Sequence, residues 1–192
     1  SGANRSVLPG DLAAAGPRKS EYLLLQQEIP LETVEAALRA GRKAGAVSVL
    51  NTAPFRAEAA SFIGEADYIV ANETEFDLYA DALSLPKGDR TRRMAAFAER
   101  TGRTLIVTLG AEGVLAATPG EALAVPALKV TPVDTVGAGD TFCGYLAASL
   151  ASGLPLEQAL RRATAAASLA CLKEGAQPSI PLAAEVDRAM KG

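Results

Sequence analysis

The sequence predicts an α/β fold in which helices cover both faces of a mostly parallel β-sheet. Short apolar runs alternate along the chain with longer segments whose apolar residues recur at helical spacing, as in successive βαβ units. Several of the short runs are apolar almost throughout, which is typical of strands that are buried on both faces. The 192 residues, of which 49% are hydrophobic, are enough to form the core of one domain.

The first half of the chain supplies most of the predicted strands. Each is a short apolar run, and together they cover residues 21–27, 46–50, 67–71 and 104–109. Helices are predicted between these strands, at residues 31–44, 56–63, 73–79 and 90–101. In the first helix Leu31, Val34 and Leu38 share one face, and Gly102 provides a C-terminal stop for the last.

The second half of the chain is predicted to be mainly helical. A short antiparallel excursion is expected at residues 114–117 and 122–125, around Pro119 and Gly120. Three helices follow, and they cover residues 137–151, 156–172 and 181–190, with a loop at 173–180 joining the last two. There is no internal repeat, so we expect one domain over residues 1–192.

Charge and residue usage exclude several classes of function. A net charge of −3 gives no reason to expect nucleic acid or an anionic membrane as a partner. The absence of histidine excludes Ser-His-Asp and Cys-His catalysis and histidine zinc sites. Cys143 and Cys171 lie in apolar helical patterns and are expected to be reduced core thiols. No signal peptide or membrane-length apolar run is visible, so a soluble cytoplasmic protein is expected.

The segment Gly-Ala-Gly-Asp at residues 137–140 begins one of the predicted helices. Its glycines let the backbone approach a ligand closely, and the helix dipole and free N–H groups point to the same place. This arrangement suits a phosphate, with the carboxylate of Asp140 beside it. Alternatively, Asp140 only complements the helix dipole, which is worth about 0.3–1 kcal/mol. The segment matches neither the dinucleotide-binding GxGxxG pattern nor the P-loop.

Three further motifs lie where a ligand-binding edge would place them. The glycines of TLGAEG (108–113) follow the clearest strand, where they either bind a ligand or form a simple turn. The motif NETE (72–75) offers an amide and a carboxylate suited to a nucleotide and hydrated Mg²⁺, or forms only a helix-capping box. The motif GAQPS (175–179) is either a plain loop or a set of carbonyl groups that coordinate a cation.

These motifs together resemble the ribokinase-like, or PfkB, family of carbohydrate kinases. The resemblance covers essentially the whole chain and is carried by VDTVGAGDTF (133–142), NETE, VTLGAEG (107–113), GAQPS and NTAP (51–54). It implies the family's three-layer α/β/α sandwich. It also implies ATP-dependent transfer of the γ-phosphoryl group to the 5-hydroxyl of D-ribose, with fructose, 2-keto-3-deoxygluconate or a nucleoside as alternative acceptors.

The resemblance implies roles for individual residues. Asp140 would be the catalytic base and touch the sugar, Glu28 would bind the sugar, and the anion hole would be formed by Gly137, Ala138 and Gly139. Nucleotide contacts are implied for Asn72, Thr108, Gly110, Gly113, Gly139 and Thr164. Glu75 would act on Mg²⁺ through water. A monovalent-cation site, for K⁺, is implied at Asp134, Val136, Ala170, Lys173, Gly175 and Ser179.

The resemblance further implies that this chain is the C-terminal portion of a kinase domain. Family members carry roughly 100 more residues before this region, as expected for a sugar kinase of ordinary size. We therefore expect the nucleotide-binding half and the base, with the N-terminal strands and a small β lid missing. The expected partners are a small-molecule sugar and ATP, with a homodimer formed through the missing lid. A non-catalytic nucleotide-binding fragment is the alternative to a kinase.

Overall fold

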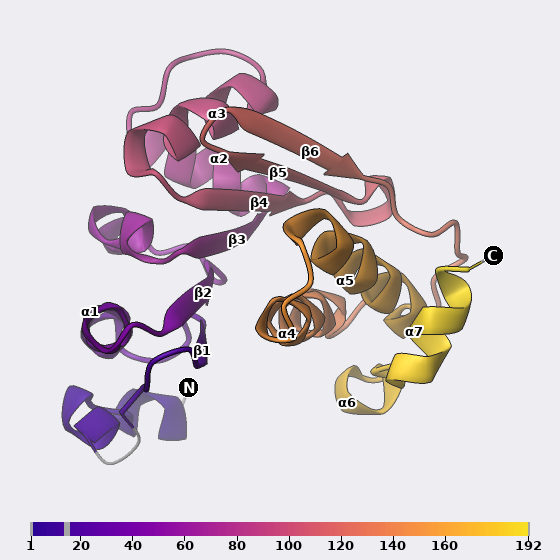
Figure 1. Cartoon of the computed structure of the whole chain (residues 1–192), viewed down its shortest axis with the longest axis horizontal. Coiled ribbons are helices and arrows are strands. Elements are labelled where there is room, and N and C mark those ends of the chain that lie inside the picture. Colours follow the sequence, from indigo (N-terminus) through magenta and orange to yellow (C-terminus); the bar gives the residue numbers. More distant parts are fainter. Residues whose placement is uncertain (1, 14–15, 192) are drawn as a thin grey trace. The chain divides into compact units, whose positions relative to one another are not determined.

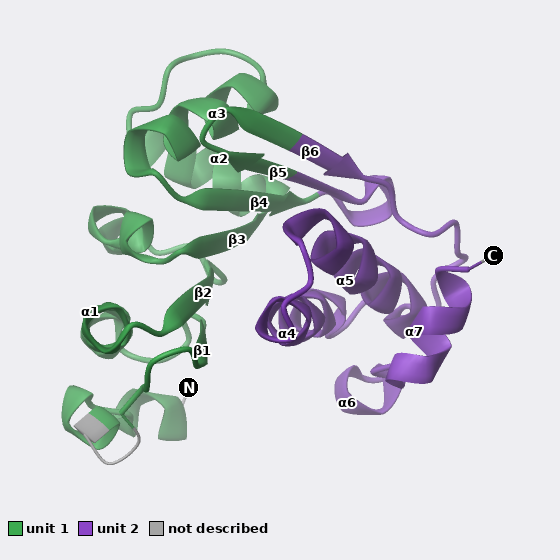
Figure 2. Cartoon of the chain, viewed as in Figure 1, with its two compact units in different colours: residues 1–108, 116–122 green, residues 109–115, 123–192 purple. Residues whose placement is uncertain are grey.

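The computed structural model describes residues 2–13 and 16–191 and divides the chain into two compact units (Figures 1 and 2). Unit 1 comprises Ser1–Thr108 and Ala116–Ala122, and unit 2 comprises Leu109–Leu115 and Leu123–Gly192. Each unit is packed within itself. Within the described residues, no helix is long and apolar enough to cross a membrane.

The sheet has six strands, whose spatial order follows their order in the chain. They are β1 (Tyr22–Leu25), β2 (Val47–Asn51), β3 (Tyr68–Asn72), β4 (Thr104–Thr108), β5 (Val114–Thr118) and β6 (Glu121–Val125). The first four belong to unit 1 and pair in parallel, which confirms the predicted parallel sheet. The connections into β5 and β6 are too short for a parallel crossover, so these strands form the expected antiparallel excursion.

Three α-helices connect or follow the parallel strands of unit 1 (Figure 1). They are α1 (Leu31–Ala44), α2 (Glu73–Ala82) and α3 (Arg90–Thr101). Each forms because one face is apolar: α1, for example, buries Val34 and Leu38 and ends at Gly45, which adopts the left-handed conformation. Each crossover moves to the next strand in the same direction, and crossovers between parallel strands are right-handed as a rule, which puts successive helices on the same face of a sheet.

The core of unit 1 lies between this helical layer and the strands. Its largest fully buried side chains include Phe76 on α2, Phe97 on α3 and Ile69 on β3. Full burial of each such side chain contributes about 1.5–3 kcal/mol. This packing fixes the parallel strands, so the residues at their carboxyl ends share a rigid edge.

Unit 2 is built from helices. After a 3₁₀ turn at Gly110–Glu112 it contains α4 (Ala138–Ala151), α5 (Leu156–Ala170), the single turn α6 (Ala176–Ser179) and α7 (Ala183–Ala189). Small buried residues, such as Ala163 and Ala166 on α5, allow close helix packing. Val186 on α7 packs with Ala165 and Ala166, so the C-terminal helix is held against α5.

Two predicted elements are wrong, and several boundaries shift. Residues 56–63 do not form an α-helix but two 3₁₀ turns, Ala57–Ser61 and Ile63–Glu65, because Phe62 leaves the helical region with φ −132°. The predicted loop 173–180 contains the helical turn α6. Helix α5 ends at Ala170 and not at residue 172, since the carbonyl of Cys171 accepts hydrogen bonds from Val133 and Asp134 instead.

Candidate functional site

The carboxyl ends of the parallel strands bring several predicted residues to one edge of unit 1. Glu28 follows β1, the segment 51–54 follows β2, and Asn72 and Thr108 end β3 and β4. Asn72 and Thr108 are register partners in neighbouring strands. The Thr108 hydroxyl donates to the Ala71 carbonyl at 3.4 Å. This is the edge of a parallel sheet at which ligands bind.

A capping box begins α2 at this edge. The Asn72 side chain accepts a hydrogen bond from the Glu75 amide at 2.8 Å, and the Glu75 carboxylate accepts one from the Asn72 amide at 3.1 Å. Glu75 is buried, with 9% of its surface exposed. The capping role considered from the sequence is therefore confirmed. In the capping box only Oε2 of Glu75 accepts a hydrogen bond. The same bond fixes the orientation of the carboxylate and therefore the position of Oε1.

Glu28 lies beside a buried polar network that the sequence analysis missed. Its carboxylate is exposed and accepts a hydrogen bond from the Asn4 amide at 3.3 Å. The neighbouring Gln27 is 1% exposed, and its side-chain nitrogen faces the carbonyls of Thr52 at 3.2 Å and Pro54 at 3.0 Å. The Tyr79 hydroxyl lies 2.8 Å from the same amide. The only signal in the sequence was a glutamine at the end of an apolar run.

In unit 2, the predicted anion hole forms the N-terminus of α4. Gly137 is the N-cap and adopts the left-handed conformation, with φ 76°. No side chain caps this helix. The Ala138 amide donates to the Thr135 carbonyl at 3.3 Å, and the other first N–H groups have no intrahelical partner. Asp140 lies in the first turn and is exposed. The structure therefore puts a carboxylate beside a group of amides that can bind an anion.

Asp134 holds the loop before α4 against the segment after α5. Its carboxylate accepts hydrogen bonds from the amides of Val136 at 3.0 Å and Gly175 at 2.9 Å. These two N–H groups hold the pKa of Asp134 below its ordinary value of 3.8. Asp134 is therefore a carboxylate at neutral pH. Three of the residues predicted to form the monovalent-cation site are thus brought together within unit 2.

The remaining predicted cation ligands lie in the same part of unit 2. The Ala170 carbonyl accepts a hydrogen bond from the Lys173 amide at 3.3 Å, and Ser179 is fully buried with its hydroxyl on the Ala176 carbonyl at 2.8 Å. The Lys173 ammonium lies 3.6 Å from the Glu185 carboxylate, so its charge is balanced. Carbonyl oxygens and one carboxylate are donors that suit a hard cation.

The segment after α5 also packs directly on the anion hole. A Cβ added at Gly137 would lie 3.0 Å from the Cα and the Cβ of Ala176. This distance is closer than an ordinary van der Waals contact. Gly137 is therefore required twice, for its left-handed backbone and for the close approach of Ala176.

The other predicted nucleotide contacts of unit 2 have distinct settings. Gly110 and Gly113 lie at the turn between β4 and β5, which the Gly113 carbonyl closes by accepting the Leu109 amide at 2.8 Å. The turn considered from the sequence is therefore present. Thr164 on α5 is 5% exposed, and its hydroxyl has no hydrogen-bond partner among the described residues. Asn72 and Thr108 belong to unit 1, so the nucleotide site as a whole stays a prediction.

Metal ions in proteins are usually held by clusters of His, Cys, Asp or Glu side chains. Among residues 2–13 and 16–191, no group of three or more His, Cys, Asp or Glu side chains could hold a metal ion.

Comparisons with known proteins extend these observations. Residues 12–183 match the model of the pfkB family carbohydrate kinases. The chain is 38% identical to a ribokinase of Lactococcus lactis over 99% of this chain and 61% of that protein. It is 34% identical to a deoxyribokinase of Salmonella typhi over 94% of this chain and 60% of that protein.

A solved structure shows the same fold. The crystal structure of a ribokinase from Thermotoga maritima matches 99% of this chain and 63% of its own, with a TM-score of 0.88 and 32% identity. The predicted ribokinase-like α/β fold is thereby confirmed. The chain spans about three fifths of the length of these relatives. The family match covers most of this chain, which therefore belongs to the pfkB family of carbohydrate kinases.

Proposed function

We propose that this chain is the nucleotide-binding and catalytic-base portion of an ATP-dependent ribokinase. The observation that carries the proposal is the N-terminus of α4, where Asp140 stands beside uncapped amides. The loop before this helix is fixed by the carboxylate of Asp134. A preorganised set of N–H groups next to an exposed carboxylate is what phosphoryl transfer to a hydroxyl requires.

Asp140 acts in this proposal as the general base. Its carboxylate accepts the proton of the sugar 5-hydroxyl while that oxygen forms its bond to the γ-phosphorus of ATP. The bond to the bridging oxygen breaks, and ADP leaves with the electron pair. The amides from Gly137 to Asp140 stabilise the negative charge of the phosphoryl group during this transfer. The chain contributes position and charge, which supply most of the catalysis in reactions of this class.

Two cations fit residues of this chain. Glu75 would act on Mg²⁺ through water, because its capping bond leaves Oε1 for such a contact. Asp134, with the carbonyl groups of the segment after α5, would hold K⁺ next to the anion hole. When bound, Mg²⁺ neutralises phosphate charge and K⁺ supports the shape of the loop.

The sugar acceptor in this proposal is ribose. Glu28 would contact the sugar, because its exposed carboxylate stands at the ligand-binding edge of unit 1. Both a ribokinase and a deoxyribokinase are among the relatives, at 38% and 34% identity. We favour ribose over deoxyribose, fructose, 2-keto-3-deoxygluconate and nucleosides because ribokinases recur among the relatives and the chain is 38% identical to one of them.

The base role is tested by Asp140→Asn in the full-length protein. We expect the substitution to lower kcat by about 10²–10⁴-fold, the usual contribution of a general base. The affinity for ATP should stay within a few-fold, because the backbone amides remain in place. ADP release with ribose gives kcat, and calorimetry gives the ATP affinity. An ordinary kcat in the variant would remove Asp140 from this role.

The substrate assignment is tested by comparing ADP formation across the five acceptor classes named above. A higher kcat/KM for ribose than for the other acceptors supports the proposal. A higher kcat/KM for another acceptor would mean that the protein is a kinase for that acceptor and not a ribokinase. Calorimetry of this chain with ATP and Mg²⁺ tests the alternative that the protein binds a nucleotide without catalysing transfer. Binding by a full-length protein that phosphorylates no acceptor would indicate a non-catalytic nucleotide-binding protein.

The cation assignment predicts that K⁺ accelerates transfer. We expect the rate to fall when K⁺ is replaced by Na⁺ at constant ionic strength, because the carbonyl donors would then surround a smaller ion. The ATP concentration and Mg²⁺ concentration are held constant in this comparison. Equal rates in the two salts would contradict a K⁺ site at Asp134.

A further inference from the structure

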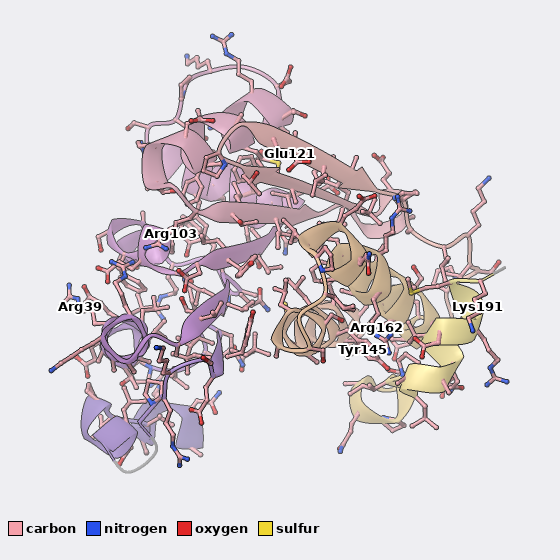
Figure 3. The ribbon with its side chains drawn as sticks, viewed as in Figure 1. Arg39, Arg103, Glu121, Tyr145, Arg162 and Lys191 are labelled. Carbon is pink, nitrogen blue, oxygen red and sulfur yellow. The ribbon has the colours of Figure 1, made fainter. Side chains whose placement is uncertain are left out.

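Tyr145 links helix α4 to the segment that follows α6. Its hydroxyl donates a hydrogen bond to the Pro181 carbonyl at 2.6 Å. Tyr145 lies on the same helix as Asp140, just over one turn further along. Figure 3 shows Tyr145 close to Arg162 in the region where α4, α5 and α7 meet. The side chain is half-buried, whereas Pro181 is buried. This contact therefore lies inside the packed part of unit 2.

The segment between Gly175 and Pro181 is attached at both ends to the region that begins α4. At its start, the Gly175 amide donates to Asp134 at 2.9 Å, and Ala176 packs on Gly137. At its end, the carbonyl of Pro181 accepts the Tyr145 hydroxyl. Between these points the Ser179 hydroxyl closes the helical turn on Ala176. The segment is thus clamped along α4, from the N-cap to the second turn.

The hydroxyl of Tyr145 is not needed merely to dock the C-terminal helix. Helix α7 is held to α5 by an ion pair between Arg162 and Asp187 at 2.6 Å and by the burial of Val186. The start of α7 is closed by the Glu185 carboxylate, which accepts the Leu182 amide at 2.6 Å. These contacts act on residues after Pro181. The Tyr145 contact acts on the end of the segment that packs against Gly137.

We propose that Tyr145 is a positioning residue that, through Pro181, keeps the segment 175–181 seated against Gly137 and thereby holds the anion hole in shape. When the hydroxyl bond is lost, the segment leaves Gly137 more often, and the loop at Asp134 loses a partner with it. The effect on phosphoryl transfer rests on the proposed kinase function. The effect on the segment itself does not, because it follows from the contacts within unit 2.

The test compares Tyr145→Phe with Asp187→Asn in the full-length protein. The first substitution removes only the hydroxyl, and the second removes only the ion pair that docks α7. Hydrogen exchange is measured amide by amide. We expect Tyr145→Phe to accelerate exchange of the Gly175 amide at least 10-fold, while Asp187→Asn accelerates exchange mainly within α7. Equal effects of the two variants at Gly175, or no effect of Tyr145→Phe, would overturn the proposal.

Kinetics provide the readout that a purely structural role would not produce. For Tyr145→Phe we expect kcat to fall several-fold and the K⁺ concentration for half-maximal rate to rise, with the KM for sugar unchanged. Asp187→Asn should leave these parameters as they are. If the unsubstituted protein phosphorylates no acceptor, the proposed function fails. If it is active and Tyr145→Phe has the same kcat and K⁺ dependence, the present inference fails.

A measurement on the unsubstituted protein covers the case in which Tyr145→Phe does not fold. A seated segment predicts that the Gly175 amide exchanges at least 100-fold more slowly than an unprotected amide of the same sequence. Free exchange at Gly175 in the folded protein would mean that the segment is not held, and it would refute the role of Tyr145 without any variant.

Discussion

Replacing Gly137 with alanine should destabilise unit 2 by about 1–4.5 kcal/mol. A residue with a Cβ pays about 1–2 kcal/mol for the left-handed conformation, and Gly137 has φ 76°. The added Cβ would also lie 3.0 Å from two atoms of Ala176, and overpacking of this kind costs about 1–3 kcal/mol. The lower entropy of the unfolded alanine variant offsets about 0.4–1 kcal/mol of these costs.

Gly139, two residues further along and inside α4, provides a matched control. It has no positive φ, and among the described residues outside its own helix turn no atom lies within 4 Å of the position of an added Cβ. Because it is already inside α4, alanine there should raise stability by up to about 1 kcal/mol through its better helix propensity. Both substitutions replace glycine by alanine, but Gly137→Ala should lower the free energy of unfolding and Gly139→Ala should raise it.

Native-state hydrogen exchange of the slowest α4 amides measures this difference, because it reports the free energy of opening unit 2 in either variant. Urea unfolding followed by circular dichroism gives an independent value. The reasoning would be refuted by a Gly137→Ala variant that is as stable as Gly139→Ala. Such a result would mean either that Ala176 moves away at no cost or that the N-cap does not hold its left-handed conformation in solution.

The two glycines of the turn after β4 and the buried tyrosine of α2 lead to further predictions. Gly113→Ala should prevent or severely weaken folding of unit 2, because its Cβ would lie 2.1 Å from the Val125 carbonyl, whereas Gly110→Ala should cost only about 1–2 kcal/mol for a positive φ in open space. Thermal unfolding of both variants checks this, and similar midpoints would contradict it. Burial raises the pKa of Tyr79 above its ordinary value of 10.0, so its contribution to stability is complete below pH 10 and is lost as pH rises through the raised pKa. Between pH 8 and 11, the free energy of unfolding measured with urea should decline less steeply for Tyr79→Phe than for the unsubstituted protein. Parallel declines would exclude a contribution of Tyr79 to the pH dependence of stability.

The motifs that carry the family resemblance were readable from the sequence because they are local. The parallel strands appear as apolar runs, since both of their faces are buried, and the NETE capping box requires only residues that are three positions apart. The position of Asp140 in the first turn of a helix follows from the two glycines before it. Such features depend on backbone conformation and near neighbours.

Contacts between distant segments could not be predicted in this way. The sequence does not show that Gln27 is buried against Tyr79, 52 residues away, nor that Tyr145 reaches Pro181. The error at residues 56–63 has the same origin, because a helical pattern of eight residues is too short to outweigh local packing.

The sequence by itself determined the fold class, the order of the strands and helices along the chain, and the place of Asp140 in the first turn of a helix. These follow from hydrophobic periodicity and from the conformational freedom of glycine, which are properties of short segments. Only the tertiary structure decided that Asp134 accepts a hydrogen bond from Gly175 and that Ala176 packs against Gly137. It also decided that Tyr145 donates a hydrogen bond to Pro181, at the end of the same segment. The physical reason is that these contacts join segments separated by loops, and packing of the helices fixes where each loop returns.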